Sequence, residues 1–418
     1  MASASVSTLP RSTRNTRSSP PRIGLALAGG GPLGAIWEIG ALCALEDSIP
    51  GLRLTEACAF VGVSAGGFVA AGLANGIGPR ELCRSFIENE GPPGDVFDPA
   101  ILMRPAWGEI ISRVSKLPAL AAIAALDYSL GIASRSQVLD RLGRGVPTGL
   151  FSNTTVHEHL SRVFSAPGRS NDFRALDRRL VLVAVDLDSG EARPFGMPGH
   201  DEVPISLAVQ ASAALPGLFP PLEIDGRCYV DGALRKTLHA SVILDEGLDL
   251  LLCLNPLVPY DGRVSEQAGV ELELGEAPIR RLVDGGLPQV LSQTFRSMIR
   301  SRMELGLGRY GKQYPDTDIV LFEPDPGDAS IFFSNPFSYS QRKRMAEHAY
   351  QATRAQLRRR QATLGATLAV HGLRLDEAVL NDPLQRLLDT RAAPRGRAQV
   401  ALRRLDAVLD ELDTRLAA

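Results

Sequence analysis

The sequence contains no uninterrupted apolar run long enough to span a bilayer. The first candidate, residues 23–37, includes five glycines and a proline and stops at Glu38, short of the ~20 residues that a spanning helix needs. The second, residues 117–133, includes Asp127 and a proline near its start, which favours a buried or interfacial helix. We therefore expect a globular protein without a membrane-spanning helix.

Cysteine is scarce and scattered. The five cysteines lie at positions 43, 58, 83, 228 and 253, and no two are close enough for a CxxC pair or a metal site. An odd number of cysteines without a disulfide framework favours a reducing compartment, so we expect a cytoplasmic protein. The chain also lacks the acidic cluster that is typical of a cation site, and we expect neither a metal ion nor a cofactor.

A strong net charge is missing as well. The formal charge is −2 at pH 7, which exerts no overall attraction on nucleic acid, and we expect no nucleic-acid partner. A local exception is 341–360, a predicted helix with seven Arg and Lys residues. Two interpretations of this helix stay open: a solvated face, and peripheral contact with anionic lipid headgroups at a membrane.

The two ends of the chain differ in composition from its middle. Residues 1–22 are rich in Ser, Thr, Arg and Pro and contain no acid, which predicts a disordered tail. A targeting or secretion role for this tail stays open. Residues 261–418 are expected to form a mainly helical extension with one further strand.

Short apolar runs alternate with helix-like segments near the start of the chain. Residues 23–29 and 57–63 predict buried strands, and 33–47 and 65–76 predict helices. This β-α-β-α order predicts a parallel, right-handed α/β sheet. Further strands are predicted at 179–187, 226–232, 249–256 and 318–324. Residues 91–175 show no clear strand and are expected to form a helical insertion that can act as a lid.

Ser64 lies in the sequence GVSAG, between a predicted strand and a predicted helix. A serine becomes a nucleophile only on an exposed tight turn, with a base for its proton and donors for an oxyanion. Gly62 and Gly66 supply the turn, because glycines let the strand reverse sharply into the helix. Taken alone, the five residues are equally compatible with a structural turn.

A glycine-rich loop follows the first predicted strand. Gly29, Gly30, Gly31 and Gly34 expose backbone N–H groups that can gather around an anion. The same residues match G-x-G-x-x-G, which raises the alternative of a non-catalytic nucleotide-binding protein. That alternative needs an acid at the end of the second strand, where this chain has Ser64.

Two candidates remain for the base. A triad of Ser64, Asp231 and His239 would follow the chain order of α/β-hydrolases. Against it, the glycine loop lies only 33 residues before the serine, and a structural role for His239 is more natural in LRKTLHASV. Asp231 alone is the other candidate, since it ends a predicted strand and precedes a glycine. An Asp-Gly pair is also common in ordinary turns.

Taken together, these stretches resemble the patatin-like phospholipase family of Ser-Asp lipid acyl hydrolases. The match comprises GGGPLG after the first strand, GVSAG after the second, and DGA, with Gly232 and Ala233, at the end of residues 208–234. The resemblance covers roughly residues 23–260 as a catalytic domain. It implies a three-layer α/β/α fold with a mostly parallel central sheet.

The resemblance also implies roles for particular residues. Ser64 would be the nucleophile, Asp231 the proton acceptor, and the amides of Gly30 and Gly31 the oxyanion donors. The implied substrate is a lipid or phospholipid acyl ester. Leu33 stands where the family often has an arginine, so the phosphate contact that this arginine would make is not implied here and the head-group preference stays open. The sequence does not reveal which ester is cleaved, or the oligomeric state.

Overall fold

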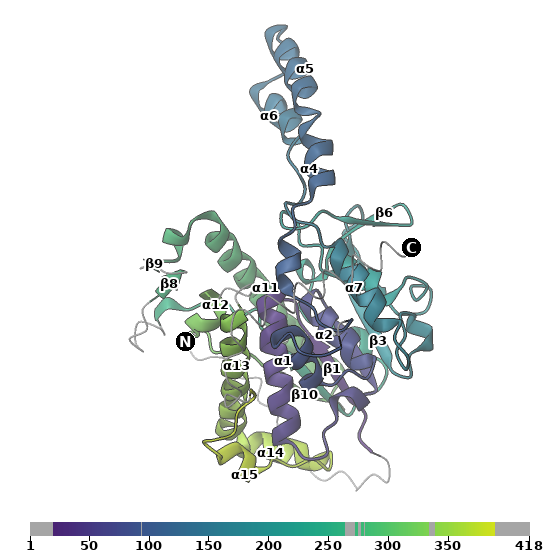
Figure 1. Cartoon of the computed structure of the whole chain (residues 1–418), viewed down its shortest axis with the longest axis vertical. Coiled ribbons are helices and arrows are strands. Elements are labelled where there is room, and N and C mark those ends of the chain that lie inside the picture. The colour runs from purple at the N-terminus through teal and green to yellow at the C-terminus, as the bar shows by residue number, and fades with distance from the viewer. Residues whose placement is uncertain are drawn as a thin grey trace.

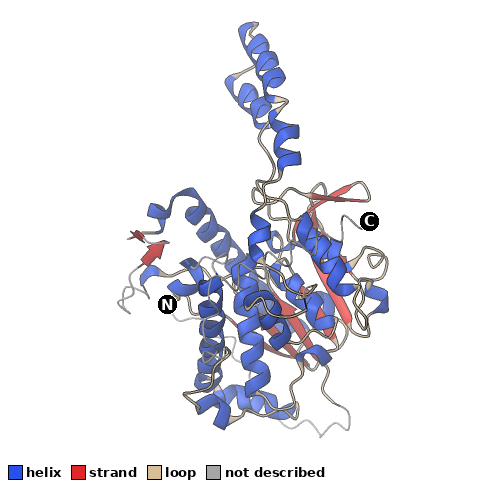
Figure 2. Ribbon diagram, viewed as in Figure 1, coloured by secondary structure: helices blue, strands red, loops and turns tan. Residues whose placement is uncertain are grey.

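The computed structural model describes residues 20–92, 94–263, 272–274, 277–279, 281–333 and 339–388. These residues form a body with an eight-stranded sheet at its centre and helices on both faces (Figure 1, Figure 2). This is the mostly parallel α/β/α arrangement that the resemblance implied. Most of the predicted tail and the end of the C-terminal extension lie outside the described residues.

The central sheet consists of β1 (Ile23–Leu27), β2 (Ala59–Gly62), β3 (Arg179–Asp186), β4 (Ala192–Phe195), β5 (Leu222–Ile224), β6 (Arg227–Asp231), β7 (Leu250–Leu254) and β10 (Asp318–Phe322). Each strand is hydrogen-bonded to the next in the series β10-β7-β1-β2-β3-β6-β5, and β4 also pairs with β3. The strands from β10 to β3 are parallel, whereas β4, β5 and β6 pair antiparallel. All six predicted strands are confirmed. The sequence analysis missed β4, which contains a proline, and β5, which has three residues.

The helices of the body are α1 (Gly31–Ser48), α2 (Ala65–Ala74), α3 (Pro79–Leu82), α7 (Thr154–Phe164), α8 (Ile205–Ser212), α9 (Ser241–Leu244), α11 (Gly286–Gln313), α12 (Ala329–Phe333), α13 (Tyr339–Arg359), α14 (Gln361–Val370) and α15 (Glu377–Asn381). Short 3-10 turns occur at Leu54–Glu56, Pro99–Met103, Phe173–Ala175, Gly232–Leu234 and Leu282–Gly285, and Cys83–Ile87 forms a π-helical turn.

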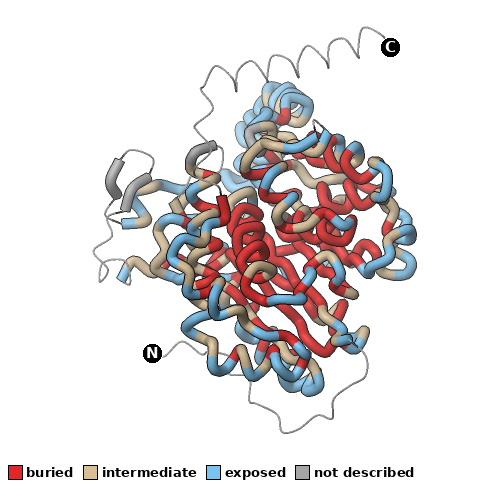
Figure 3. Tube along the Cα trace, turned by 60° about the horizontal axis from the view of Figure 1, so that its bottom comes forward, coloured by how far each residue is buried: buried red, intermediate tan, exposed pale blue. Residues whose placement is uncertain are grey.

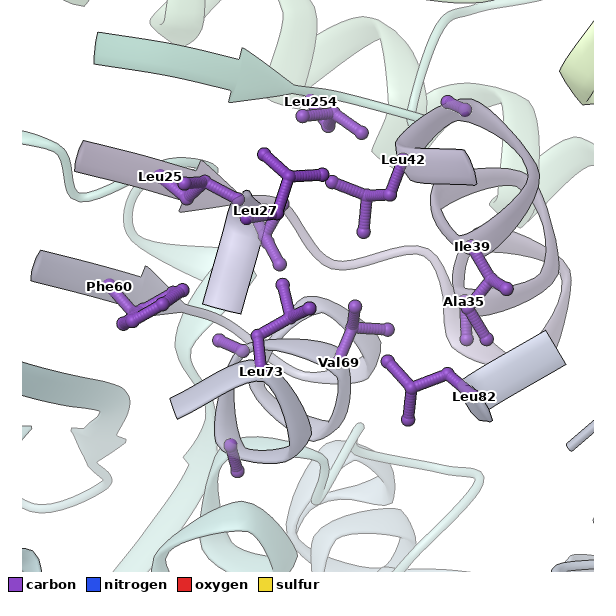
Figure 4. Packing of buried hydrophobic residues seen from close by; sticks show 14 of the residues in the cluster. Leu25, Leu27, Ala35, Ile39, Leu42, Phe60, Val69, Leu73, Leu82 and Leu254 are labelled. Carbon is purple, nitrogen blue, oxygen red and sulfur yellow. The ribbon is translucent and has the colours of Figure 1, made fainter. Parts of the chain in front are cut away.

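Different helices bury the two faces of the sheet. Leu25 and Leu27 of β1 belong to a hydrophobic cluster that includes side chains of α1 and α2, among them Leu42 and Val69 (Figure 4). Ala26, between them, belongs to a second cluster with side chains of α9 and α11. Successive side chains of a strand point to opposite faces, so the sheet is covered on both sides. The buried core in Figure 3 accordingly runs through the body.

Described segments that follow residue 260 take part in this body, although they were expected to form an extension of it. β10 is an edge strand of the central sheet and pairs with β7. α13 crosses α1 so closely that a Cβ on Gly40 would lie 2.5 Å from the carbonyl oxygen of Ala346. A two-stranded sheet of β8 (Leu272–Leu274) and β9 (Ala277–Ile279) also follows residue 260, so the described part of this region contains three strands where one was expected.

The basic helix predicted at 341–360 is α13, and neither open interpretation fits its two innermost arginines. Arg342 and Arg354 are 1% and 2% exposed. Arg342 donates to the carbonyl of Phe86 at 3.0 Å, and Arg354 donates to the carbonyl of Asp382 at 2.8 Å. These two side chains therefore join α13 to distant segments of the body.

The predicted insertion divides into two parts. α7 packs on α8 within the body. The other helices, α4 (Trp107–Val114), α5 (Leu117–Ser129) and α6 (Arg135–Gly143), belong to residues 104–150, which we call the arm. Figure 1 shows the arm extended away from the body and not folded over it. None of the helices in the described part of the chain combines the length and the apolar character needed to cross a bilayer.

Candidate active site

Ser64 occupies a strained turn between β2 and α2. Its backbone angles are φ 54° and ψ −122°, a conformation that residues other than glycine rarely adopt. α2 begins at the next residue, so the positive end of its dipole lies at Ser64. Strain of this kind is typical of a serine held at the apex of a strand-to-helix turn.

The glycines on either side of Ser64 are required by close backbone approach. A Cβ on Gly62 would lie 2.6 Å from the carbonyl oxygen of Gly66. A Cβ on Gly66 would lie 2.4 Å from the carbonyl oxygen of Ala28, the residue that follows β1. Both distances are shorter than any real Cβ contact, so the turn tolerates no side chain at either position.

β3 brings the ends of β2 and β6 together. Gly62, the last residue of β2, pairs with Leu182. Asp231, the last residue of β6, pairs with Ala184, two residues further along β3. β4 pairs with the same two β3 residues and therefore occupies one edge of β3. Because a strand has only two edges, β2 and β6 both pair along the other edge of β3. Ser64 follows Gly62 by two residues and therefore reaches the same point of this edge as Asp231.

The carboxyl group of Asp231 is buried beside Ser64. Burial raises the pKa of Asp231 from 3.8 to about 6, while the N–H of Ala233 and hydrogen bonding with the Ser64 side chain act in the opposite direction. The N–H of Ala233 donates to Oδ1 of Asp231 at 2.8 Å. A carboxyl group with this pKa is ionised at neutral pH and can accept a proton from a neighbouring hydroxyl.

The glycine-rich loop lies against the same two residues. A Cβ on Gly29 would be 3.2 Å from the Cβ of Ser64 and 3.2 Å from the Cβ of Ala233. α1 begins at Gly31, so the N–H groups of its first turn have no intrahelical acceptor. Gly30 and Gly34 pack against Pro256, which follows β7. The N-termini of α1 and α2 thus meet at Ser64, which makes this a favourable place for negative charge.

Gly232 also fits only as glycine. A Cβ at this position would lie 2.2 Å from the carbonyl oxygen of Val183 in β3. The predicted residues of all three motifs therefore lie around Ser64 in the structure.

His239 is placed differently from what a triad requires. Its side chain is buried, and Nε2 is 3.3 Å from the carbonyl oxygen of Gly232. Burial lowers the pKa of His239 to about 4, so the ring is neutral near pH 7 and Nε2–H is the donor. Nε2 of His239 therefore donates its proton to the backbone carbonyl of Gly232.

Ser212 is a residue at the site that the sequence analysis missed. It is the last residue of α8 and is fully buried. Its Oγ accepts a hydrogen bond from the N–H of Ser64 at 2.8 Å and donates to the carbonyl of Val183 at 2.6 Å. One hydroxyl thereby ties the strained turn to β3. The only signal in the sequence was its place in the segment that leads to Asp231.

We expect Ser212→Ala to lower kcat about 10- to 100-fold with little change in KM, because the turn loses the group that orients it. The variant should also lose about 1–3 kcal/mol of stability, since two buried backbone groups lose their partner. Steady-state kinetics and chemical denaturation measure both effects. Ser206→Ala is the matched control: this buried serine of α8 bonds Asn171 and His157 instead, and its loss should reduce stability alone.

A cavity of about 120 Å³ is bordered by α2 and α7. Phe68 and Gly72, four residues apart on one face of α2, line it. Leu160 and Phe164 of α7 line it as well. Part of the predicted insertion thus borders a partly apolar space next to α2, the helix that follows Ser64.

A family model described as patatin-like phospholipase matches residues 25–242, more than half of the 418-residue chain. VipD from Legionella pneumophila is similar at 16% identity and a TM-score of 0.36, over 82% of this chain and 68% of that one.

The structure of the type III effector protein ExoU is similar at 16% identity and a TM-score of 0.33, over 82% of this chain and 54% of that one. A third match is to the complex of full-length SpcU with full-length ExoU from the type III secretion system of Pseudomonas aeruginosa, at 17% identity and a TM-score of 0.27, over 70% of this chain and 53% of that one. This chain spans about half the length of those two matched chains. From the family match, the chain belongs to the patatin-like phospholipase family.

Proposed function

We propose that this protein hydrolyses the acyl esters of lipids with Ser64 as the nucleophile and Asp231 as the base. The observation that carries the proposal is the position of the two side chains: a serine on a strained turn beside a buried carboxyl group with a pKa of about 6. Membership of the patatin-like phospholipase family supports a lipid substrate.

In the first step, Asp231 accepts the proton of the Ser64 hydroxyl as the serine oxygen attacks the ester carbonyl carbon. The carbonyl oxygen becomes an oxyanion, and we assign its stabilisation to the backbone N–H groups of Gly30 and Gly31 at the start of α1. The tetrahedral intermediate then collapses, the alcohol leaves with the proton from Asp231, and the acyl group stays on Ser64.

In the second step, water hydrolyses the acyl-enzyme. Asp231 accepts a proton from the water as its oxygen attacks the acyl carbon, and the proton returns to Ser64 when the fatty acid leaves. The raised pKa of Asp231 suits both directions, because the group must gain and lose a proton near neutral pH. No step needs a metal ion or an imidazole.

The triad alternative predicts that His239 is essential, and the dyad predicts that it is not. We expect His239→Asn to retain activity within about threefold, because asparagine tolerates the positive φ of 45° and keeps a donor for Gly232. Release of fatty acid from a phospholipid and from a short-chain ester provides the measurement. A folded His239→Asn protein as inactive as Ser64→Ala would favour the triad, and no hydrolysis by the unmodified protein would refute the proposed function itself.

A further inference from the structure

The arm exposes apolar side chains to an unusual extent. The described residues include 23 exposed large hydrophobic side chains, and 11 of them lie in residues 104–150. In α5 only Ala124 is buried, although residues 117–126 contain no charged side chain. Soluble monomers rarely expose a contiguous apolar surface of this kind unless it meets a partner.

The exposed side chains follow the length of the arm. On α4, Trp107, Ile111 and Val114 lie at helical spacing and are 63%, 63% and 44% exposed. Leu130 and Ile132, in the turn between α5 and α6, are 62% and 68% exposed. α5 and α6 form the far end of the arm in Figure 1, so this turn is remote from the body's core.

The charge of the arm has the opposite sign to that of the whole chain. Residues 104–150 contain six Arg and Lys residues and three Asp and Glu residues, whereas the chain carries −2 overall. Two of the three acids form ion pairs inside the arm, Glu109 with Arg113 and Asp127 with Arg141. A basic surface with exposed leucine, isoleucine and tryptophan matches an anionic bilayer, which offers negative headgroups above an apolar layer.

The base of the arm joins the body beside the candidate active site. The N–H groups of Leu150 and Phe151 donate to the carbonyl of Leu218 at 3.1 and 2.9 Å. Leu218 lies four residues after Ala214, whose carbonyl accepts a hydrogen bond from the N–H of Asp231 at 3.0 Å. A surface that holds the arm is therefore close to the site where an ester would react.

We propose that the arm docks this protein on lipid bilayers with anionic headgroups, with its apolar side chains entering the boundary between headgroups and acyl chains. The inference rests on the proposed function insofar as the docked bilayer supplies the substrate. Docking itself needs no catalysis, so it is tested in the Ser64→Ala variant, which leaves the vesicles intact.

The two tryptophans of the chain provide the measurement. Trp37 is fully buried in α1, whereas Trp107 on α4 is exposed. Vesicles of equal parts phosphatidylcholine and phosphatidylglycerol should bind the protein in a flotation assay and shift the emission of Trp107 to shorter wavelength. Brominated acyl chains should quench this emission, and Trp107→Phe should remove the response. Vesicles of phosphatidylcholine alone should bind more weakly.

Variants then locate the contact. Leu130→Asp with Ile132→Asp should weaken vesicle binding at least about tenfold, because two apolar contacts become charged groups of the same sign as the headgroups. The matched control is Val370→Asp with Leu384→Asp, two exposed apolar residues, 56% and 79% exposed, near α14 and α15 at the opposite end of the molecule (Figure 1). This control should bind as the parent does.

Three results would overturn the proposal. They are no vesicle binding by the Ser64→Ala protein, unchanged binding after Leu130→Asp with Ile132→Asp, or equally weakened binding after Val370→Asp with Leu384→Asp. An arm variant that changes the sedimentation coefficient of the protein without vesicles would assign the surface to a second copy of the chain instead. Failure of ester hydrolysis, by contrast, would leave these binding results untouched and would count against the proposed function alone.

Discussion

Ser64→Ala is expected to lower turnover by roughly 10⁴- to 10⁶-fold on both a phospholipid and a short-chain ester. The substitution removes the oxygen that forms the acyl-enzyme and leaves the Cβ, so the packing of the turn against Gly29 is preserved. Fatty-acid release is the measurement. A serine-directed phosphonate provides a second one, since it should add its mass to the parent protein and not to the variant.

Ser64→Gly is the informative companion to this variant. Glycine adopts a φ of 54° without strain, so this variant should be as inactive as Ser64→Ala but more stable by about 1 kcal/mol or more. Chemical denaturation distinguishes the two. Retention of turnover in a correctly folded Ser64→Ala protein would remove the nucleophile assignment.

Asp231→Asn is expected to lower turnover about 10²- to 10⁴-fold, because asparagine cannot accept the serine proton. It keeps an oxygen that accepts the hydrogen bond from the N–H of Ala233. The unmodified protein should show a kcat/KM that rises with pH around a midpoint of about 6, the pKa of this carboxyl group. Asp231→Asn should have lost that rise.

The same substitution should stabilise the protein at neutral and alkaline pH. The pKa of Asp231 is raised from 3.8 to about 6 on folding, so the folded protein favours the protonated group. The contribution of this group to the free energy of unfolding is fully present below pH 3.8 and is lost as the pH rises through 6. At pH 8 the variant should therefore be more stable by about 3 kcal/mol, and at pH 5 by about half of that. Denaturation at the two pH values is the test. A variant less stable than its parent at pH 8 would mean that hydrogen bonds to the ionised carboxylate outweigh the cost of its burial, which would contradict the raised pKa.

Much of the site was predictable from the sequence because its requirements are local. Gly62, Gly66 and Gly232 are needed where a Cβ would collide with backbone, and such positions leave glycine as the only choice. Strands buried on both faces leave short, continuous apolar runs. The order of these runs and turns predicted the parallel sheet.

Other features depend on which segments meet, and spacing along the chain does not reveal that. The expected C-terminal extension is part of the body because β10 pairs with β7, and the basic helix α13 is anchored by two buried arginines. The segment predicted as a lid divides in the structure into the arm, which extends away from the body, and α7, which lies in the body.

The sequence by itself determined the candidate residues of the site, namely a serine on a glycine-flanked turn, a glycine-rich loop and an Asp-Gly pair. Only the tertiary structure decided how these are joined. β3 pairs with β2 and β6 along one edge and so brings Ser64 to Asp231, and Ser212 reaches Ser64 across 148 residues. The position of His239 was also decided by the tertiary structure, in which its Nε2 bonds the carbonyl oxygen of Gly232. The physical reason is that strand pairing and burial bring together residues whose separation along the chain carries no information about their distance in space.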